Sequence, residues 1–219
     1  MAEVLSGGGL FTLEDSKRLQ LDAYSASAAT AVALFQGWSS SDAAVEAARE
    51  DLATWDAVYR RESRAAAIFD RVRRQIPLGS VDPSGGAGVQ AALEEAIGLA
   101  LQQLRESLGD DPAEWRWGRL QRSEFPHSLV EAFDLPTAER SGGAGTVAAT
   151  GATYRHIIDF SDLDASVATN APGQSGRPGS PFYGNLTASW ASGEYFPLLF
   201  TREAVESQAE YRLLLKPSG

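Results

Sequence analysis

Cysteine is absent from this sequence. Its absence excludes disulfide bonds and thiolate metal sites, although it does not fix the cellular compartment. Histidine is nearly absent too: only His127 and His156 are present, which leaves few candidates for a catalytic base or a metal ligand. Basic residues number 19 against 29 acidic ones, and the net charge is −10. Because phosphate binding needs concentrated Lys and Arg, this balance argues against nucleic acid as a partner.

Long apolar runs are also missing. No run approaches the roughly 20 residues that a helix needs to span a bilayer. Residues 1–10 have neither the basic region nor the apolar region of a signal peptide. The 219 residues, 43% of them hydrophobic and 22% charged, have the composition of an ordinary globular protein. They are enough for one sizeable core or two small ones.

The first half of the chain has the apolar spacing of helices, in four stripes with intervals of three and four residues. The first helix is predicted to start near Glu14 and to stop at Gly37, and the second to follow N-cap candidates at 39–42. The third ends at Pro77 and the fourth at 110–112. The stripes are Leu21, Tyr24, Ala28, Val32 and Phe35; Val45, Ala48, Leu52, Trp55 and Tyr59; Ala65, Ile68, Phe69, Val72 and Ile76; and Leu93, Ile97, Leu101, Leu104 and Leu108.

From Trp115 onward the pattern changes to short alternating segments between loops. We predict a loop at 141–146 and a short helix that begins after Thr201 and ends at Gln208. The predicted strands are 115–120, 153–160, 165–169 and 211–215. Helices first and strands later are typical of an α+β fold.

We therefore predict an α+β fold with a helical region at 1–110 and a region of strands and long loops at 111–219. The second region is poor as a free-standing sheet, because its strands are few and short and would leave open edges. We expect these strands to pair with a sheet supplied by something else. The two regions are then one incomplete domain rather than two autonomous ones.

The segment Gly173-Gln-Ser-Gly176 invites a serine-nucleophile hypothesis. A nucleophile elbow reads G-x-S-x-G and joins a strand directly to a helix, but here Arg177 takes the fifth position. Pro172 and Pro178 flank the serine with loop chemistry instead. We therefore favour a structural turn at Ser175 over a nucleophile.

The remaining polar candidates are also better explained by structure. A Ser-His-Asp triad needs a histidine base, but His127 lies in a predicted loop and His156 in a predicted strand. Their spacing matches no H-E-x-x-H or comparable metal motif. The aspartates Asp159, Asp162 and Asp164 could bind Ca²⁺, but their spacing is not that of an EF-hand loop. We favour hydrogen-bonded histidines and a solvated turn.

Three further patterns concern structure or modification. Arg155 and Asp159 share the face of their predicted strand opposite Tyr154 and Ile158, so we expect either an ion pair or an arginine that holds loop carbonyls. Asn185-Leu-Thr187 matches the glycosylation sequon, a weak and common pattern. The aromatic residues Trp115, Trp117, Trp190, Tyr195 and Phe196 are expected in the core.

A dense cluster of Gly, Pro and Ser at 170–183 reads Asn-Ala-Pro-Gly-Gln-Ser-Gly-Arg-Pro-Gly-Ser-Pro-Phe-Tyr. It resembles the C-terminal signature of the penicillin acylase family, amide hydrolases with an N-terminal nucleophile. Other segments resemble that family in the same order and spacing, at 13–22, 51–56, 62–69, 117–122, 125–129, 142–155 and 158–159. The chain departs from the family pattern at Gln121 and Phe182, where relatives commonly have His, and at 184–185, where an acidic residue is usual.

The resemblance implies the C-terminal portion of an αββα fold of N-terminal-nucleophile hydrolases. In that family a Ser exposed by autocatalytic cleavage attacks the amide, and its own α-amine is the general base. Backbone N–H groups and an Asn stabilise the oxyanion. These residues lie upstream of the region represented here, and neither Met1 nor Ala2 offers the nucleophile. The resemblance thus assigns this chain no catalytic, cofactor-binding or metal residue; the family's structural calcium has upstream ligands, and its members are periplasmic or secreted.

Three hypotheses follow. In the first, the chain is the C-terminal portion of a penicillin-acylase-like amidase, inactive without its N-terminal part. The complete enzyme would hydrolyse an N-acyl amide such as a β-lactam side chain, an acyl-homoserine lactone or a lipopeptide acyl group. In the second, it is a non-catalytic partner of a split acylase. In the third, it is an independent serine hydrolase that uses Ser175.

Overall fold

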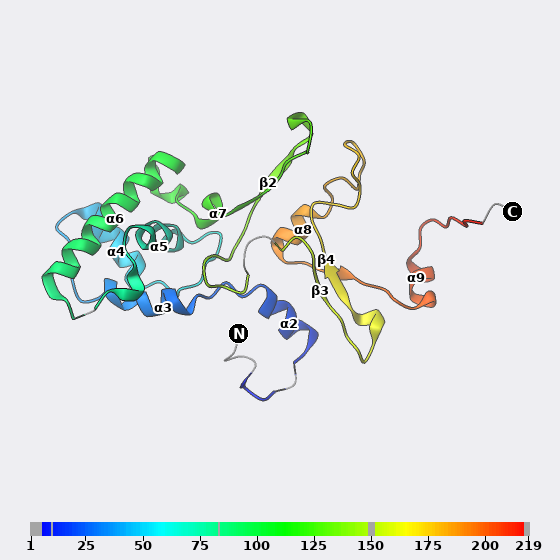
Figure 1. The fold of residues 1–219 in the computed structure, drawn as a ribbon, viewed down its shortest axis with the longest axis horizontal. Coiled ribbons are helices and arrows are strands. Elements are labelled where there is room, and N and C mark those ends of the chain that lie inside the picture. Colours follow the sequence, from blue (N-terminus) through cyan, green and yellow to red (C-terminus); the bar gives the residue numbers. More distant parts are fainter. Residues whose placement is uncertain (1–5, 10, 83, 149–151, 217–219) are drawn as a thin grey trace. The chain divides into compact units, whose positions relative to one another are not determined.

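The computed structural model describes residues 6–9, 11–82, 84–148 and 152–216. The chain forms two compact units, one of residues 1–9 and 18–151 and the other of residues 10–17 and 152–219. Helices come first along the chain and short strands later, as Figure 1 shows by colour. The predicted α+β class is therefore confirmed. None of the helices among the described residues is long and apolar enough to cross a membrane.

The first unit is built mainly of helices packed side by side (Figure 1). One further helix, α2 (Leu13–Gln20), has residues in both units. The helices of the first unit are α3 (Ala26–Val32), α4 (Ala43–Ala53), α5 (Arg64–Gln75), α6 (Gly86–Leu108) and α7 (Trp117–Leu120), with 3₁₀ turns η1 (Ala33–Phe35), η2 (Leu78–Ser80) and η3 (Pro112–Glu114).

Side-chain caps begin α4 and α5, and the cap of α4 lies among the N-cap candidates predicted at 39–42. Asp42 accepts hydrogen bonds from the backbone N–H groups of Ala44 and Val45 at 2.8 and 3.0 Å, at the start of α4. Ser63 does the same for α5 with the N–H of Ala66. Each side chain thereby satisfies N–H groups that have no partner inside the helix.

The single helix predicted from Glu14 to Gly37 is wrong. The chain leaves α2 after Gln20, and Asp22 accepts the N–H of Tyr24 in a turn. Ser25 then caps a new helix, α3, by accepting the N–H of Ala28 at 3.3 Å. Asp and Ser compete with the helix by bonding to nearby backbone groups, which breaks a continuous apolar stripe into two helices.

The core of the first unit lies between α4, α5 and α6. Most residues of the predicted stripes are buried, among them Leu52, Ile68, Val72, Ile97 and Leu104. Tyr24 of the first stripe is instead 44% exposed. Four aromatic rings extend this core, with Trp55, Phe69 and Trp117 all in contact with the ring of Tyr59 at centroid distances of 5.0 to 6.4 Å.

Tyr59 also connects distant parts of the chain through its backbone. Its N–H donates to the carbonyl of Ala23 at 2.9 Å, and its carbonyl accepts the N–H of Gly142 at 2.8 Å. The indole N–H of Trp117 donates to the carbonyl of Gly142 at 2.7 Å. The loop predicted at 141–146 is thus held against the helices by buried hydrogen bonds.

The strand predicted at 115–120 is also wrong. Within this segment residues 117–120 form the single helical turn α7, and the 3₁₀ turn η3 has already ended at Glu114. The N–H groups of Trp117 and Gly118 donate to the carbonyls of Ser63 and Arg61, at 3.0 and 2.7 Å. The strands of this unit follow instead as an antiparallel hairpin that the sequence reading missed: β1 (Arg122–Phe125) and β2 (Leu135–Glu139), with η4 (Glu131–Phe133) between them.

The second unit contains a three-stranded antiparallel sheet in the order β3-β4-β5. The strands predicted at 153–160 and 165–169 are present but shorter, as β3 and β4. The helix predicted after Thr201 is confirmed. The strand predicted at 211–215 is not formed. The elements are β3 (Arg155–Ile157), η5 (Leu163–Ala165), β4 (Val167–Thr169), α8 (Thr187–Ser192), β5 (Phe196–Pro197) and α9 (Arg202–Gln208).

Two leucines of α6 offer a matched test of this core. Leu104 is fully buried, whereas Leu99 is 42% exposed on the same helix. We expect Leu104→Ala to lower the free energy of unfolding by about 2–5 kcal/mol, because it leaves a cavity. Leu99→Ala should change it by about 0.5 kcal/mol or less. Urea unfolding followed by tryptophan fluorescence measures both, and equal effects would contradict the observed packing.

Candidate functional site

The signature segment at 170–183 forms a closed loop in the second unit. The N–H groups of Gln174 and Ser175 both donate to the carbonyl of Phe182, at 3.0 and 3.1 Å. On the other side of the loop, the N–H of Leu186 donates to the carbonyl of Pro172 at 3.0 Å. These bonds join the two ends of the segment, so its shape is set by backbone hydrogen bonds rather than by a strand or a helix.

Gly173 lies where two stretches of backbone come close together. A Cβ atom at this position would be 2.3 Å from the carbonyl oxygen of Phe182 and 2.7 Å from that of Tyr183. Both distances are shorter than real Cβ contacts, so only glycine fits without a shift of the loop. Gly176, three residues on, has no atom within 4 Å of the same built position.

The serine hydroxyl of Ser175 takes part in the turn. Its Oγ accepts the N–H of Arg177 at 3.2 Å, and its own N–H is directed to Phe182. The segment around it forms turns and bends, not the strand and helix that meet at a nucleophile elbow. This geometry agrees with the structural turn predicted for Ser175.

The two histidines belong to different units. The Nδ1 of His127 accepts the N–H groups of Leu129 and Val130, at 3.3 and 3.1 Å, in the connection between β1 and β2. His156 lies on β3 with its ring 5.2 Å from that of Tyr154. The acceptor nitrogen of His127 is already used by backbone groups, as a structural role requires.

The three aspartates considered for Ca²⁺ accept hydrogen bonds from N–H and hydroxyl groups. Asp159 accepts the hydroxyl and N–H of Ser161, and Asp162 accepts the N–H of Asp164. Asp164 accepts the hydroxyl and N–H of Thr201 and the N–H of Phe200. These hydrogen bonds lower the pKa of the carboxyl groups of Asp159 and Asp164 below the ordinary value. Among the residues that the structure describes, no group of three or more possible metal ligands comes together.

Arg155 is held between two aromatic rings. Its guanidinium lies 5.8 Å from the ring centroids of Trp190 and Tyr195, and its Nη2 donates to the carbonyl of Trp190 at 2.9 Å. Burial lowers the pKa of Arg155 from its ordinary value. Neither of the two arrangements predicted for Arg155 is found as stated: no ion pair with Asp159 is formed among the described residues, and the carbonyl that Arg155 reaches belongs to Trp190 of α8 rather than to a loop.

A cavity of about 390 Å³ lies on one side of β3 in the second unit. Its lining includes one carboxylate, Asp159, and no histidine or cation, so it has no pair of acid and base. The residues that line it are Phe11, Thr12, Leu13, Ser16, Ile157, Ile158, Asp159, Phe160 and Ser161.

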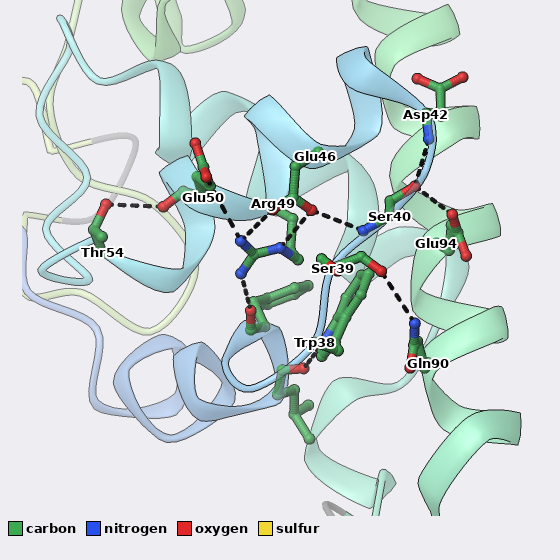
Figure 2. Close-up of polar contacts among 12 residues, drawn as sticks. Trp38, Ser39, Ser40, Asp42, Glu46, Arg49, Glu50, Thr54, Gln90 and Glu94 are labelled. Carbon is green, nitrogen blue, oxygen red and sulfur yellow. Dashed lines mark hydrogen bonds and ion pairs between the residues drawn. The ribbon is translucent and has the colours of Figure 1, made fainter.

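A network of hydrogen bonds around Arg49 and Glu46 lies in the first unit (Figure 2). The guanidinium of Arg49 donates to both carboxylate oxygens of Glu46, at 2.6 and 2.8 Å, and to the carbonyl of Phe35 at 2.8 Å. The N–H of Ser40 donates to Glu46, while its hydroxyl bonds to Glu94 of α6. The network fastens the segment before α4 to both α4 and α6, and none of its contacts presents a reactive group.

The bond from Arg49, together with that from the N–H of Ser40, lowers the pKa of Glu46 to about 2. Sequence reasoning missed this network, although Glu and Arg three residues apart on a helix are a known local signal. The contacts of Arg155 had no such signal, because Trp190 lies 35 residues further along the chain.

The other predicted positions are placed as follows. Trp115, Trp117 and Trp190 are buried, as expected of core residues, whereas Tyr195 and Phe196 are only half-buried. Asn185 of the sequon is exposed, and the Thr187 hydroxyl donates to the carbonyl of Pro172 at 3.3 Å. Residues 1 and 2, considered as a nucleophile position, lie outside the described residues.

The family model for penicillin amidase matches residues 1–207. This chain belongs to the penicillin amidase family. The acyl-homoserine lactone acylase QuiP of Pseudomonas syringae pv. tomato (strain ATCC BAA-871 / DC3000) is 30% identical to it over 147 residues, which are 58% of this chain and 18% of that protein. QuiP of Pseudomonas fluorescens (strain Pf0-1) is 31% identical over 121 residues, 49% of this chain and 15% of that protein.

A solved structure shows a similar fold. The thermostable penicillin G acylase from Alcaligenes faecalis matches with a TM-score of 0.53 and 14% identity, over 100% of this chain and 52% of that chain. The chain therefore corresponds to about half of that solved chain and to less than a fifth of the curated relatives it matches.

The close approach at Gly173 gives a prediction about the signature loop. We expect Gly173→Ala to speed hydrogen exchange at the amides of Gln174 and Ser175, because the added methyl pushes the carbonyl of Phe182 away from both. Gly176→Ala, which meets open space, is the matched control and should leave those amides unchanged. Equal exchange rates in the two variants would contradict the loop geometry.

The lowered pKa of Glu46 gives a prediction about pH. A folded-state pKa below the unfolded value stabilises the fold fully above the unfolded pKa, and this stabilisation is lost as pH falls through the folded pKa. We expect the stability advantage of the wild type over Glu46→Gln to hold above about pH 5 and to shrink toward about pH 2. Urea unfolding across that range measures it, and a difference independent of pH would contradict the lowered pKa.

Proposed function

We propose that this chain is the C-terminal section of an N-acyl amide hydrolase and has no hydrolase activity by itself. The observation that carries this proposal is the family match over 1–207, combined with the small share of the relatives that the chain covers. In such an enzyme the N-terminal Ser, its α-amine and the oxyanion donors belong to a complementary section. We place no catalytic residue and no cofactor in this chain.

The local geometry supports a structural rather than a catalytic part for these residues. Ser175 is hydrogen-bonded within its turn, and Nδ1 of His127 accepts two backbone N–H groups. A general base needs a free lone pair within hydrogen-bond reach of the proton that it removes. What this chain contributes is a helical core in the first unit and, in the second, a closed signature loop beside the buried Trp190.

The substrate class follows from the named relatives. Two of them are acyl-homoserine lactone acylases and a third is a penicillin G acylase, and both names describe removal of an acyl group from a small amide. We propose that the complete enzyme acts on an N-acyl amide of this kind, an acyl-homoserine lactone or a β-lactam side chain. The complementary section is either continuous with this chain or a separate subunit.

A fusion tests the proposal. The upstream part of the Pseudomonas syringae acylase, truncated before the region that aligns with this chain, is joined to residues 1–219 or co-expressed with them. We expect the fusion to hydrolyse an N-acyl-homoserine lactone, measured as released homoserine lactone by chromatography, and each part alone to show no turnover. Activity on co-expression would identify a separate subunit as sufficient.

The controls separate the alternatives. Alanine in place of the N-terminal nucleophile of the relative should abolish turnover by the fusion, while Ser175→Ala should retain it. Turnover by this chain alone that disappears in Ser175→Ala would overturn the proposal and support an independent serine hydrolase. A fusion without activity, in folded and processed form, would also contradict it.

A further inference from the structure

The residues after α9 form no regular structure although their composition is that of a strand. Tyr211, Leu213, Leu214 and Leu215 are 91%, 84%, 77% and 82% exposed. Large apolar side chains gathered in one exposed segment are a mark of an interaction site. The backbone of 211–216 has no hydrogen bond to any other described residue, so its donors and acceptors are available as well.

The sequence of this segment suits a strand with one apolar face. In an extended chain, Tyr211, Leu213 and Leu215 share one face, and Arg212, Leu214 and Lys216 share the other. Six residues at about 3.3 Å each span about 20 Å, the ordinary length of a strand. The backbone is already extended at Ala209, where α9 ends with φ −73° and ψ 117°.

We propose that residues 211–216 form a β-strand that pairs with the edge of a sheet in the complementary section of the amidase. This proposal rests on the function proposed above. Backbone hydrogen bonds to that edge satisfy the unused donors and acceptors, and the face with Tyr211, Leu213 and Leu215 becomes buried. This is strand addition, in which main-chain bonds give affinity and alternate side chains give specificity.

The complementary section is the occupant that the observations favour. The relatives contain several times the length that the chain matches, which provides chain for such a sheet. The match to the family model ends at residue 207, so this segment lies outside the matched residues. A second copy of the chain is disfavoured by the net charge of −10 on each copy. A lipid surface is disfavoured because Arg212 and Lys216 are the segment's only cations, against Glu210.

Hydrogen exchange of the amides at 211–216 tests the proposal in the fusion and in the free 219-residue chain. In the fusion we expect exchange to slow at least about 100-fold at alternate amides, those that face the neighbouring strand, relative to the free chain. We expect Leu213→Asp to remove this protection, because it places a charge on the apolar face. Arg212→Asp adds an acidic residue to the opposite face and should keep the protection.

Other outcomes overturn the inference in distinguishable ways. An active fusion whose 211–216 amides stay unprotected would overturn the strand while the proposed function stands. An inactive fusion with protected amides would leave the strand and overturn the function. Protection in the free chain that grows with protein concentration would assign the segment to a second copy. Protection that appears only on anionic phospholipid vesicles would assign it to a lipid surface, and both results would overturn the proposal.

Discussion

The first unit depends on the pair of backbone hydrogen bonds made by Tyr59. Through them one buried residue joins the turn before α3 and the loop after β2, which are separated by more than a hundred residues in sequence. Its ring contacts Trp117, whose indole N–H is bonded to the carbonyl of Gly142. The side chain of Tyr59 is only 1% exposed, and this burial raises its pKa to about 12. Buried backbone groups must find hydrogen-bond partners, so the positions of the helices and of the loop depend on each other.

Local sequence patterns correctly predicted the helices whose hydrophobic face extends over several turns. The stripes of α4, α5 and α6 extend over several turns, and most of the residues predicted to face inward are buried, while Ala65, Ile76 and Leu108 are partly buried. For some short segments the pattern did not predict the type of secondary structure correctly. The alternating pattern of the six residues 115–120 fits a single helical turn as well as a strand. In the structure, hydrogen bonds to the carbonyls of Ser63 and Arg61 hold the helical turn. The hairpin β1-β2 escaped prediction because nine residues, not a two-residue turn, connect its strands.

The site illustrates a different limit of sequence reasoning. The signature at 170–183 indicated that its residues belong to one functional or structural unit. The loop that closes at Phe182 shows why a glycine is needed at Gly173. The partners of Arg155 could not be predicted, because Trp190 and Tyr195 reach it only through the tertiary fold. Whether Arg155 would bond to Asp159 or to a carbonyl was open for the same reason. Ser161 provides Asp159 with local donors, and the carbonyl of Trp190 is what the guanidinium reaches.

The exposed strand-like segment has a consequence for the behaviour of the isolated chain. Short segments of high β-propensity and low charge are templates for aggregation when they are exposed. Natural sequences place charged residues beside such segments as gatekeepers, and Glu210, Arg212 and Lys216 stand in those positions here. Together with the excess of acidic residues, they oppose uncontrolled stacking of the segment between chains. These charged side chains oppose aggregation, yet they leave the backbone groups of the segment able to pair with the edge of a partner sheet.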